Sequence, residues 1–552
     1  MAQHLGFKPD EAVFMNSLAV NPEGKGWRLA SVDGLEGVHS GSVVGMSGPG
    51  STALHFPLSK SHREYCEKYL EDGGDLKQVA RNGEGKYYPD ASITRRLLEK
   101  TNSASTRKLL EGKVIANSYV TEEEEELAKK VGGRTLMSSD KFLQFVGKDY
   151  IHKVADDIGI EAPPGIVIDK PAPSSSIINS FRQKLQKKGM DPDHTKVWIK
   201  PSSLCSGQGV ISLPRGDTES LREGLLELAK VFHGVGFYEE EVKESELSRD
   251  DPFKGITKFM PILLEADVGR LPWVSRKVDD VAVNAVLGQD GVVHIETTPF
   301  VAVDGEYTGS RLANPQDEPL VFAAEVSTDK LMHRMWEEGY RGYLGVDAMV
   351  VEKKNGELMA YLNDLNTRLC GATPLIGMAH KVEANVGYRP SVFSQTFTIR
   401  APENMTDPFE VIKANVGDHL YRASETEYTG IVPTVVDAYP ESGYISFRAI
   451  VIGRDDLHLG FLRKALESMD KYEGLTAVRN TSKDIGLEIG FFILIENVTQ
   501  NSNLTEFSTL QVARALTRGF ASGLAAILPP EVVLLICMVS YHDSLEVDLQ
   551  DD

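Results

Sequence analysis

Apolar and polar positions become regular from Lys113 onward, where the pattern switches between strands and helices. The apolar run 114–120 predicts a strand. The stretch after it predicts a helix capped by Thr121, and Glu124 three residues later completes a capping box. Carboxylates at a helix N-terminus interact favourably with the helix dipole. We therefore interpret this run of glutamates as a solvated helix start and not as a metal site.

A second helical pattern covers residues 142–158, where apolar residues recur at helical spacing. It predicts one amphipathic helix that ends at Gly159. Pro163 and Pro164 then open a new strand, and a basic helix is expected over 177–189. This part of the chain therefore alternates helix and strand.

The segment WIKPSSLCSGQGVISL (198–213) predicts two strands joined by a loop of small polar residues and glycines, with Lys200 at the end of the first strand. In the usual phosphate loop the lysine follows the glycines and opens a helix. Here the lysine precedes the glycines and the chain returns to a strand. A near match to a phosphate loop at 45–52 has Ser51 in place of the lysine, and we interpret it as a structural glycine turn.

The pattern after this segment predicts helices and antiparallel strands in mixed order. A hairpin is expected because Asp290 and Gly291 suit a tight turn between two apolar runs. The further predicted elements are a helix at 216–232, a strand at 256–268, a helix at 325–340, and two strands at 342–366 joined by a Lys-Asn-Gly turn. Antiparallel hairpins of this kind do not fit a simple parallel sheet, so the class is mixed α+β and α/β.

Composition narrows the class of protein without naming a function. A chain of 552 residues is too long for one core, so roughly two to four domains are expected. A net charge of −21 argues against a nucleic-acid partner, whose phosphates the chain would repel. The apolar stretch 523–541 is interrupted by Pro-Pro-Glu and is too short to span a membrane. With no secretory signal at the start, we expect a cytoplasmic location.

One predicted strand carries the residues with the clearest chemistry. Asp364, Asn366 and Arg368 stand at positions i, i+2 and i+4, so they face the same side. Asp347 can join them from the neighbouring strand. Carboxylate and amide oxygens suit Mg²⁺, and an arginine beside them can bind a phosphate or carboxylate through two hydrogen bonds. Taken alone, such a strand face is more often simply solvated, and that alternative stays open at this point.

Four motifs in order resemble the ATP-grasp superfamily over residues 115–375. Lys148 precedes GIEAPPG, and Lys200 ends a strand before a Ser/Gly loop in VWIKPSSLCSGQG. ILLEADV matches the adenine hinge, and GVD with DLNTR matches the magnesium-binding acids and asparagine. Asp364 stands where most of the superfamily has glutamate, so its reach is shorter by one methylene.

Longer stretches around these motifs resemble the pheganomycin-type peptide ligases, which place a pre-ATP-grasp domain before the catalytic core. They are GKDYIHKVADDIGIEAPPG, VDGEYTGSRL and GVDAMVV with YLNDLNTRLCGATP. The resemblance implies a pre-ATP-grasp α/β domain at 1–137 and an ATP-grasp core at 138–375 with a lid subdomain at about 196–264. It implies an accessory or dimerising α+β domain at 376–552, in which we find no catalytic constellation.

The resemblance also implies a role for each candidate residue. Catalytic roles fall to Lys200, Arg368 and Arg311, the two arginines binding the donor carboxylate or acyl-phosphate oxygens. The nucleotide would be held by Lys148, Lys200, Ser206, Gly207, Gly209, Glu265, Ala266, Asp267 and Val268. Asp267 is our assignment for the ribose hydroxyls, and magnesium would be held by Asp347, Asp364 and Asn366. Cys205 is interpreted as a bystander in the lid loop.

The function that the resemblance implies is ATP-dependent ligation of a carboxylate to an amine through an acyl phosphate, with release of ADP and phosphate. The expected cofactors are ATP and Mg²⁺, with Mn²⁺ as an alternative ion. The expected partners are amino acids or peptides, without nucleic acid or membrane, and a homodimer is one option. Two alternatives stay open. One is ligation to a thiol or carrier-protein arm, or phosphorylation of a small molecule, and the other is a non-catalytic nucleotide-binding interaction module.

Overall fold

The computed structural model describes part of the chain, and all of that part lies in the first of two units. The described residues are 5, 7–15, 52–55, 58–70, 75–78, 93–117, 120–202, 209–234, 236–239, 241–303, 306–402, 405–423, 428–439, 443–467 and 469. The chain divides between Leu475 and Thr476, and all described residues belong to the first unit. Expectations for 45–51, Cys205, Ser206, Gly207 and 470–552 lie outside the described residues.

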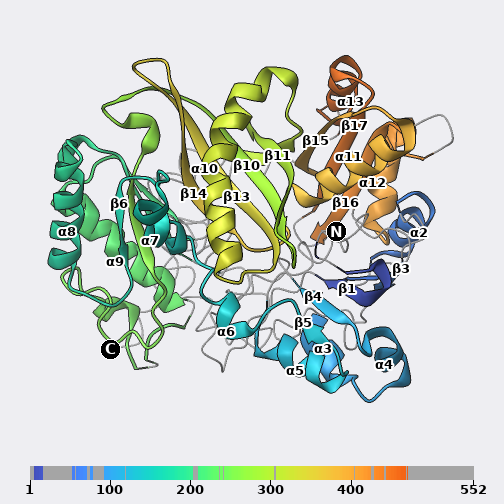
Figure 1. The fold of residues 1–552 in the computed structure, drawn as a ribbon, viewed down its shortest axis with the longest axis horizontal. Coiled ribbons are helices and arrows are strands. Elements are labelled where there is room, and N and C mark those ends of the chain that lie inside the picture. Colours follow the sequence, from blue (N-terminus) through green and yellow to red (C-terminus); the bar gives the residue numbers. More distant parts are fainter. Residues whose placement is uncertain are drawn as a thin grey trace, which may run out of the picture. The chain divides into compact units, whose positions relative to one another are not determined.

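The N-terminal part forms a parallel sheet with helices around it (Figure 1). Its strand order is β3-β2-β1-β4-β5, and the described pairs are all parallel. The strands are β1 (Ala12–Met15), β2 (Thr52–His55), β3 (Asp75–Gln78), β4 (Val114–Asn117) and β5 (Arg134–Thr135). Helices α3 (Ile93–Glu99), α4 (Ala104–Leu110) and α5 (Glu122–Lys130) contribute apolar residues to its core.

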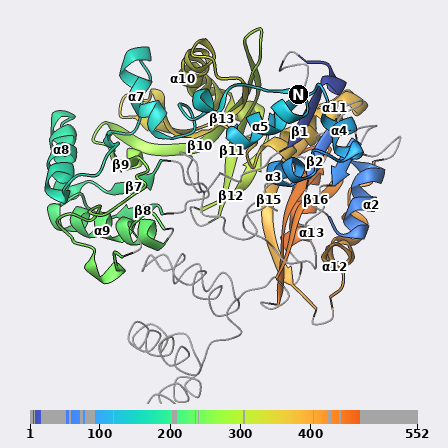
Figure 2. The ribbon, with the colours of Figure 1, turned by 90° about the horizontal axis from the view of Figure 1, so that it is seen from below.

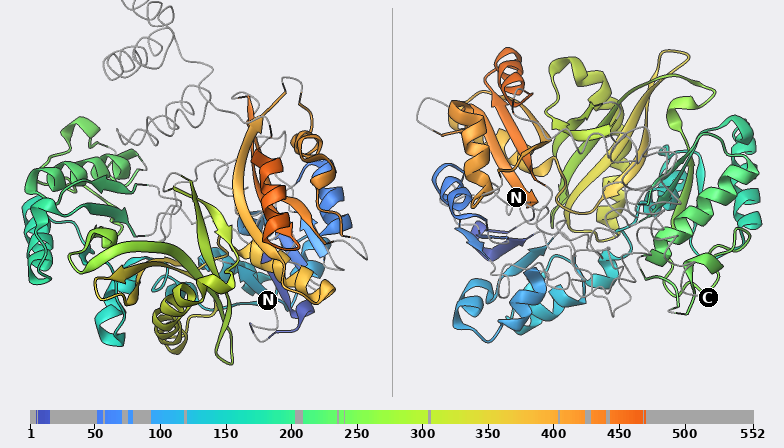
Figure 3. Two further views of the ribbon diagram at one scale, coloured as in Figure 1. Left: turned by 90° about the horizontal axis from the view of Figure 1, so that it is seen from above. Right: turned by 180° about the vertical axis from the view of Figure 1, so that it is seen from behind.

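A smaller antiparallel sheet follows, with strand order β6-β9-β7-β8. Its strands are β6 (Gly165–Ile168), β7 (Val197–Pro201), β8 (Ile211–Leu213) and β9 (Ile262–Ala266). Helices α8 (Ser174–Lys187) and α9 (Thr218–Gly234) lie on one side of it, as Figures 2 and 3 show. Val197 and Ile199 are buried in the core shared with these helices. Because side chains alternate along a strand, Trp198 and Lys200 face the opposite side.

The largest sheet has eight strands in the order β14-β13-β10-β11-β12-β15-β17-β16. Their bounds are β10 (Val274–Leu287), β11 (Val292–Val303), β12 (Glu306–Arg311), β13 (Gly342–Lys353), β14 (Leu358–Asn366), β15 (Ser391–Arg400), β16 (Gly430–Tyr439) and β17 (Tyr444–Gly453). Helices α7 (Asp149–Ile158) and α10 (Glu318–Glu337) share a core with β10, β13 and β14. The described neighbours in this sheet are antiparallel.

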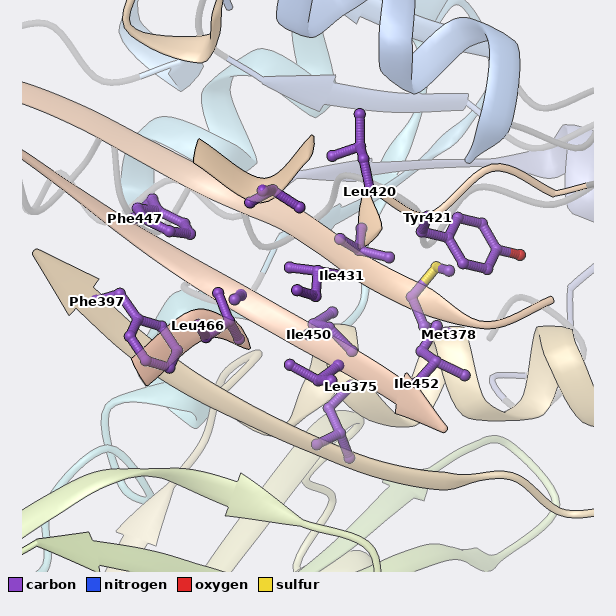
Figure 4. Packing of buried hydrophobic residues seen from close by; sticks show 14 of the residues in the cluster. Leu375, Met378, Phe397, Leu420, Tyr421, Ile431, Phe447, Ile450, Ile452 and Leu466 are labelled. Carbon is purple, nitrogen blue, oxygen red and sulfur yellow. The ribbon is translucent and has the colours of Figure 1, made fainter. Parts of the chain in front are cut away.

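The other end of this sheet packs against α11 (Thr373–Val386), α12 (Pro408–Val416) and α13 (Asp456–Glu467). Figure 4 shows Leu375 and Met378 of α11 beside Ile450 and Ile452 of β17. Helix α2 (Lys60–Tyr69) joins the same core through Tyr65, although it lies more than 300 residues away in the sequence. The β15–β17 end of the sheet is therefore covered by helices from both ends of the described chain.

The mixed fold class expected from the sequence is confirmed. A parallel α/β sheet precedes two antiparallel sheets with helices, an arrangement that agrees with the expected ATP-grasp architecture. The predicted capping box is present, since Thr121 accepts from the helix backbone and Glu124 accepts from the N–H of Thr121. The expectation that the whole glutamate run is solvated is wrong, because Glu123 and Glu124 are buried. The hairpin turn at Gly291 is also confirmed. The proposed domain boundaries stay a prediction. In the described part of the chain, no helix is both long and apolar enough to cross a membrane.

One predicted helix is wrong in its extent. The stretch 142–158 does not form one helix, because α6 (Ser139–Phe142) ends early and α7 begins only at Asp149. The break occurs where the backbone N–H of Lys148 donates to Ser202 O at 3.1 Å, outside any helix. The predicted end at Gly159 is correct, and this glycine has the left-handed conformation that commonly ends helices.

Candidate active site

Lys200 and Glu265 form a buried ion pair on the face of the smaller sheet that points away from α8 and α9. Lys200 Nζ lies 2.6 Å from Glu265 Oε2, and Glu265 is 1% exposed. Burial lowers the pKa of Lys200, but the charge of Glu265 outweighs it and raises this pKa, with a further contribution from Asp364. Lys200 is therefore a positive charge held in place by Glu265, and it interacts electrostatically with Asp364, a predicted metal ligand.

His152 of α7 completes this group, and the sequence analysis missed it. Its Nε2 lies 2.6 Å from Glu265 Oε1. Burial would raise the pKa of Glu265, but the charge of Lys200 and the hydrogen bond from His152 lower it to about 2. Glu265 is thus ionised, so His152 Nε2–H donates to it. The available signal was the spacing of four residues from Lys148, which places both on one side of a helix turn.

Lys148 lies at the start of α7 and reaches the predicted metal ligands. Its Nζ is 3.5 Å from Asp364 Oδ2, and the residue is 8% exposed. Ser202, directly after β7, holds this helix start through Lys148 N–H to Ser202 O and Asp149 N–H to Ser202 Oγ at 3.2 Å. A Cβ on Gly147 would lie 2.5 Å from Ser202 Oγ, so a larger residue there would displace this hydroxyl. Both lysines are therefore positioned by the end of the same strand, β7.

Asp347, Asp364 and Asn366 lie together, as the sequence predicts. Asp347 and Asp364 are directly opposite on β13 and β14, and Asn366 Nδ2 donates to Asp347 Oδ2 at 3.1 Å. A β-bulge makes Asn363 the extra residue beside them, and bulges of this kind often re-aim side chains at functional sites. β14 ends at Asn366, so Arg368 lies beyond the strand. The alternation from which we expected Arg368 to face the same side as Asp364 and Asn366 therefore does not extend to it.

The chemistry of these groups fits a divalent cation. Burial, and then the negative charge of Asp364, raise the pKa of Asp347 to about 8. Two carboxylates held this close repel one another, and a bound cation relieves that repulsion. Among the described residues, no group of three or more His, Cys, Asp or Glu side chains could hold a metal. The candidate set is two carboxylates with an amide oxygen, a small oxygen set of the type that Mg²⁺ completes with water and phosphate.

The two predicted arginines differ in their surroundings. Arg368 acts electrostatically on Asp347 and lowers the pKa of that carboxyl, although less than burial and Asp364 raise it. Arg311 of β12 instead binds Asp317, with Nη2 to Oδ1 at 3.0 Å, and lies 3.9 Å from Asp279. Arg311 therefore has carboxylate partners of its own, and its role at the site stays a prediction.

The predicted hinge is largely engaged in contacts within the protein. The N–H of Ala266 donates to Pro164 O at 2.8 Å, and the N–H of Asp267 donates to Lys196 O at 2.9 Å. The Asp267 carboxylate accepts from Gly269 N–H at 3.0 Å and lies 3.3 Å from Lys196 Nζ. Val268 opens the short helix η6 (Val268–Arg270) and is buried.

Of the predicted lid glycines, Gly209 lies among the described residues, and its φ of 67° favours glycine. Ser206 and Gly207 lie outside them. The structure thus brings Lys148, Lys200, Asp347, Asp364 and Asn366 into one connected group, and it adds Glu265 and His152 as side chains.

A scan against models of protein families finds no match, and a search of curated proteins finds no relative. Among solved structures, the chain is similar to biotin carboxylase from Campylobacter jejuni, with 10% identity over 83% of this chain and 91% of that chain and a TM-score of 0.46. It is also similar to N5-carboxyaminoimidazole ribonucleotide synthetase from Thermus thermophilus, with 13% identity, 84% and 98% coverage and a TM-score of 0.41. A third similar structure is phosphoribosylamine–glycine ligase from Thermotoga maritima, with 13% identity over 83% of this chain and 96% of that chain and a TM-score of 0.43. These likenesses are loose, and nothing about the substrate of this chain follows from them.

Proposed function

We propose that the chain is an ATP-grasp enzyme that joins a carboxylate to an amine, with ATP converted to ADP and phosphate. One observation carries this proposal. Lys148 Nζ, at the start of α7, lies 3.5 Å from Asp364 Oδ2, which connects the lysines to the carboxylate pair on β13 and β14. Lysines bind phosphates as point charges, and paired carboxylates bind the metal that accompanies them. The contact between Lys148 and Asp364 therefore joins the phosphate-binding part of a nucleotide site to its metal-binding part.

Each half has a defined part in holding the nucleotide. Lys148 and Lys200 bind its phosphates, and Glu265 holds Lys200 in place through their 2.6 Å ion pair. The N–H groups of Ala266 and Asp267 are engaged within the protein, so we assign the adenine contact to Val268. Asp347, Asp364 and Asn366 would hold Mg²⁺, with Mn²⁺ as an alternative. When bound, the ion neutralises the charge of the β- and γ-phosphates.

The residues of this chain act on two successive steps. First, an oxygen of the donor carboxylate attacks the γ-phosphorus of ATP, the bond to the β-phosphate oxygen breaks, and ADP leaves. Lys148 and Lys200 stabilise the negative charge that develops on the phosphate oxygens, and Arg368 orients the donor. Second, the amine attacks the acyl carbon, phosphate leaves, and the amine gives up a proton. A fixed lysine and a buried counter-ion hold these groups in one geometry, which lowers the entropic part of the barrier.

Two other enzymatic functions, ligation to a thiol and phosphorylation of a small molecule, can be distinguished from this one by the products formed from ATP. Ligation to a thiol would give ADP release that depends on a thiol, and a kinase would give a stable phosphorylated product. A nucleotide-binding module without catalysis would bind ATP and release no ADP. The peptide-ligase specificity that the pheganomycin-type resemblance implies is part of this proposal, as are the amino-acid or peptide substrates and a homodimer.

The test is ADP and phosphate release from ATP and Mg²⁺ with pools of amino acids. We expect release that depends on an amine acceptor, and its loss by at least about a hundredfold in Asp364→Ala and in Asn366→Ala, as is common when a group that stabilises the transition state is removed. Asp329→Ala, on the exposed side of α10, is the matched control and should keep wild-type turnover. Circular dichroism and Tm verify folding. Wild-type turnover in either site variant would refute the metal assignment, and no turnover with any pool would refute the ligase.

A further inference from the structure

Arg448 of β17 lies beside the segment that follows the proposed metal ligands, although 80 residues separate it from Arg368 in the sequence. Its Nη1 donates to Gly371 O at 3.2 Å. Side chains alternate along β17, so Arg448 lies opposite to Phe447 and Ala449 and on the same face as Ile450, which is buried beside α11. Helix α11 begins two residues after Gly371 and packs on β17 through Leu375, which fixes the segment there (Figure 4).

Tyr307 of β12 meets Arg448 at Gly371. A Cβ on Gly371 would lie 2.7 Å from Arg448 Nη1 and 2.9 Å from the Tyr307 hydroxyl. Glycine therefore leaves room for a guanidinium and a phenol to converge on the same point of the backbone. The Tyr307 hydroxyl also lies 3.1 Å from Ser310 Oγ, and Tyr307 is 46% exposed. We call Arg448, Tyr307 and Gly371 the β17 cluster.

The β17 cluster lies near the proposed metal ligands, because Gly371 directly follows Cys370, whose Sγ would lie 3.5 Å from a Cβ on Gly345, the residue opposite Asn366. Burial raises the pKa of Tyr307, Arg448 lowers it, and Asp347 is close enough to raise it further. The Tyr307 phenol is thus within electrostatic range of both Arg448 and Asp347, a proposed metal ligand. Arg368, three residues before Gly371, contributes a second positive charge nearby.

The charge of Arg448 is not balanced by an acid of the protein that the structure describes. No carboxylate among the described residues lies within ion-pair distance of it, whereas Arg311 and Arg389 each bind one. The chain has 80 acidic and 59 basic residues, so acidic partners are abundant. A partly buried guanidinium with one bond to a carbonyl still has N–H donors in a fork that matches a carboxylate.

We propose that Arg448 and Tyr307 bind the free carboxylate of the acceptor substrate, so the acceptor is an amino acid or a peptide whose carboxylate lies close to its amine. This inference rests on the proposed function. The donor carboxylate is consumed at the metal-type pair and near Arg368, so a second, intact carboxylate needs a separate positive charge. The bidentate fork of arginine, with the phenol O–H as a third donor, fits the two oxygens of a carboxylate.

The experiment uses the full chain and compares a pool of free amino acids with a pool of the same amino acids as C-terminal amides. Binding is measured by saturation-transfer NMR without nucleotide. Acceptor-dependent ADP release is measured with ATP, Mg²⁺ and the same pool of N-acetylated amino acids in every reaction, because C-terminal amides alone offer no donor carboxylate. The variants are Arg448→Gln, Arg448→Lys and Tyr307→Phe. Arg454→Gln is the matched control, because Arg454 lies six residues further along, is exposed, and carries the same charge.

We expect the wild type to prefer the free carboxylates, and Arg448→Gln to raise the KM for them roughly ten- to hundredfold with a smaller change in kcat, because charge-assisted hydrogen bonds are lost. Arg448→Lys should recover part of the affinity, and Tyr307→Phe should weaken it several-fold. Tyr307→Phe also serves if Arg448→Gln does not fold. Amide acceptors should respond to none of the variants.

The outcomes separate this inference from the ligase proposal. ADP release with equal use of amides and acids, or an unchanged KM in Arg448→Gln, overturns the carboxylate site and leaves the ligase standing. Carboxylate-selective binding that is lost in Arg448→Gln, without ADP release from any pool, supports the site and overturns the ligase. An equal loss of affinity in Arg454→Gln also overturns the inference, since general charge and not the fork would then explain it.

Discussion

Glu265→Gln tests whether the buried ion pair with Lys200 stabilises the smaller sheet. Gln has the shape of the protonated acid, so the change removes the charge and leaves the volume. Lys200 would then be a buried cation without its 2.6 Å partner, and His152 would lose the ionised acceptor of its hydrogen bond. Breaking one side of a buried pair is costly because the remaining charge stays desolvated.

The magnitude follows from the pKa of Glu265, which is lowered from 4.5 to about 2. At 1.36 kcal/mol per pKa unit, this difference corresponds to roughly 3 kcal/mol in favour of the charged form. A group whose folded-state pKa is lowered contributes its full stability above the unfolded pKa. That contribution is lost as the pH falls from about 4.5 through about 2. At neutral pH, Glu265→Gln should therefore lose roughly 3 kcal/mol of local stability.

Hydrogen exchange of the β7 and β9 amides, followed by mass spectrometry, measures this loss locally and avoids assuming two-state unfolding of a chain with several domains. Exchange should accelerate by roughly two orders of magnitude at neutral pH, and the difference from the wild type should shrink below pH 4.5. Adding Lys200→Met should restore part of the protection, because removing both charges leaves no unpaired cation.

The matched control is Glu227→Gln on α9, whose surface pair with Lys230 should contribute less than about 1 kcal/mol. The reasoning is refuted if Glu265→Gln exchanges no faster than this control, or if the double variant is less protected than the single one. A difference that does not change between neutral pH and pH 3 would show that shape, and not charge, determines the effect.

Two further predictions concern Lys148 and the carboxylate pair. In Gly147→Ala the new Cβ would lie 2.1 Å from Asp149 Oδ1, so this carboxylate must move and its hydrogen bond from Ser202, which holds the start of α7, is disturbed. Calorimetry should then show weaker MgATP binding and a Tm loss equivalent to about 1–3 kcal/mol, whereas Gly460→Ala, where the Cβ meets open space, should change neither. In chelator-treated protein, Asp347→Asn should have a higher Tm than the wild type, and this difference should grow from pH 4 to pH 8. The reason is that the raised pKa of Asp347 makes the wild type lose stability as the pH rises over that range. A Tm gain independent of pH would contradict this cause.

Local rules of sequence were sufficient for much of the candidate site. Alternation along a strand placed Asp364 and Asn366 on one face, and the observed register brings Asp347 opposite Asp364. Helix-ending glycine and capping-box patterns predicted the start of α5 and the end of α7. These features depend on residues a few positions apart, whose relative geometry the backbone sets directly.

The same rules failed where distant contacts outweigh local propensity. Helical spacing over 142–158 did not reveal the break at Lys148, because Ser202, more than 50 residues later, takes the Lys148 N–H as a partner. Glu265 was expected to hold the nucleotide as part of the adenine hinge, and its side chain instead pairs with Lys200 and His152. No local pattern connects α7 with the end of β9.

The sequence by itself determined which chemical groups this protein carries, their order, and the strand face that collects two carboxylates and an amide. Only the tertiary structure decided which of those groups meet. It joins Lys148 to Asp364, encloses Glu265 between a lysine and a histidine, and brings Arg448 to Gly371 from a strand 77 residues away. The physical reason is that burial and the pairing of distant strands fix these contacts, and neither is encoded in the periodicity of a single segment.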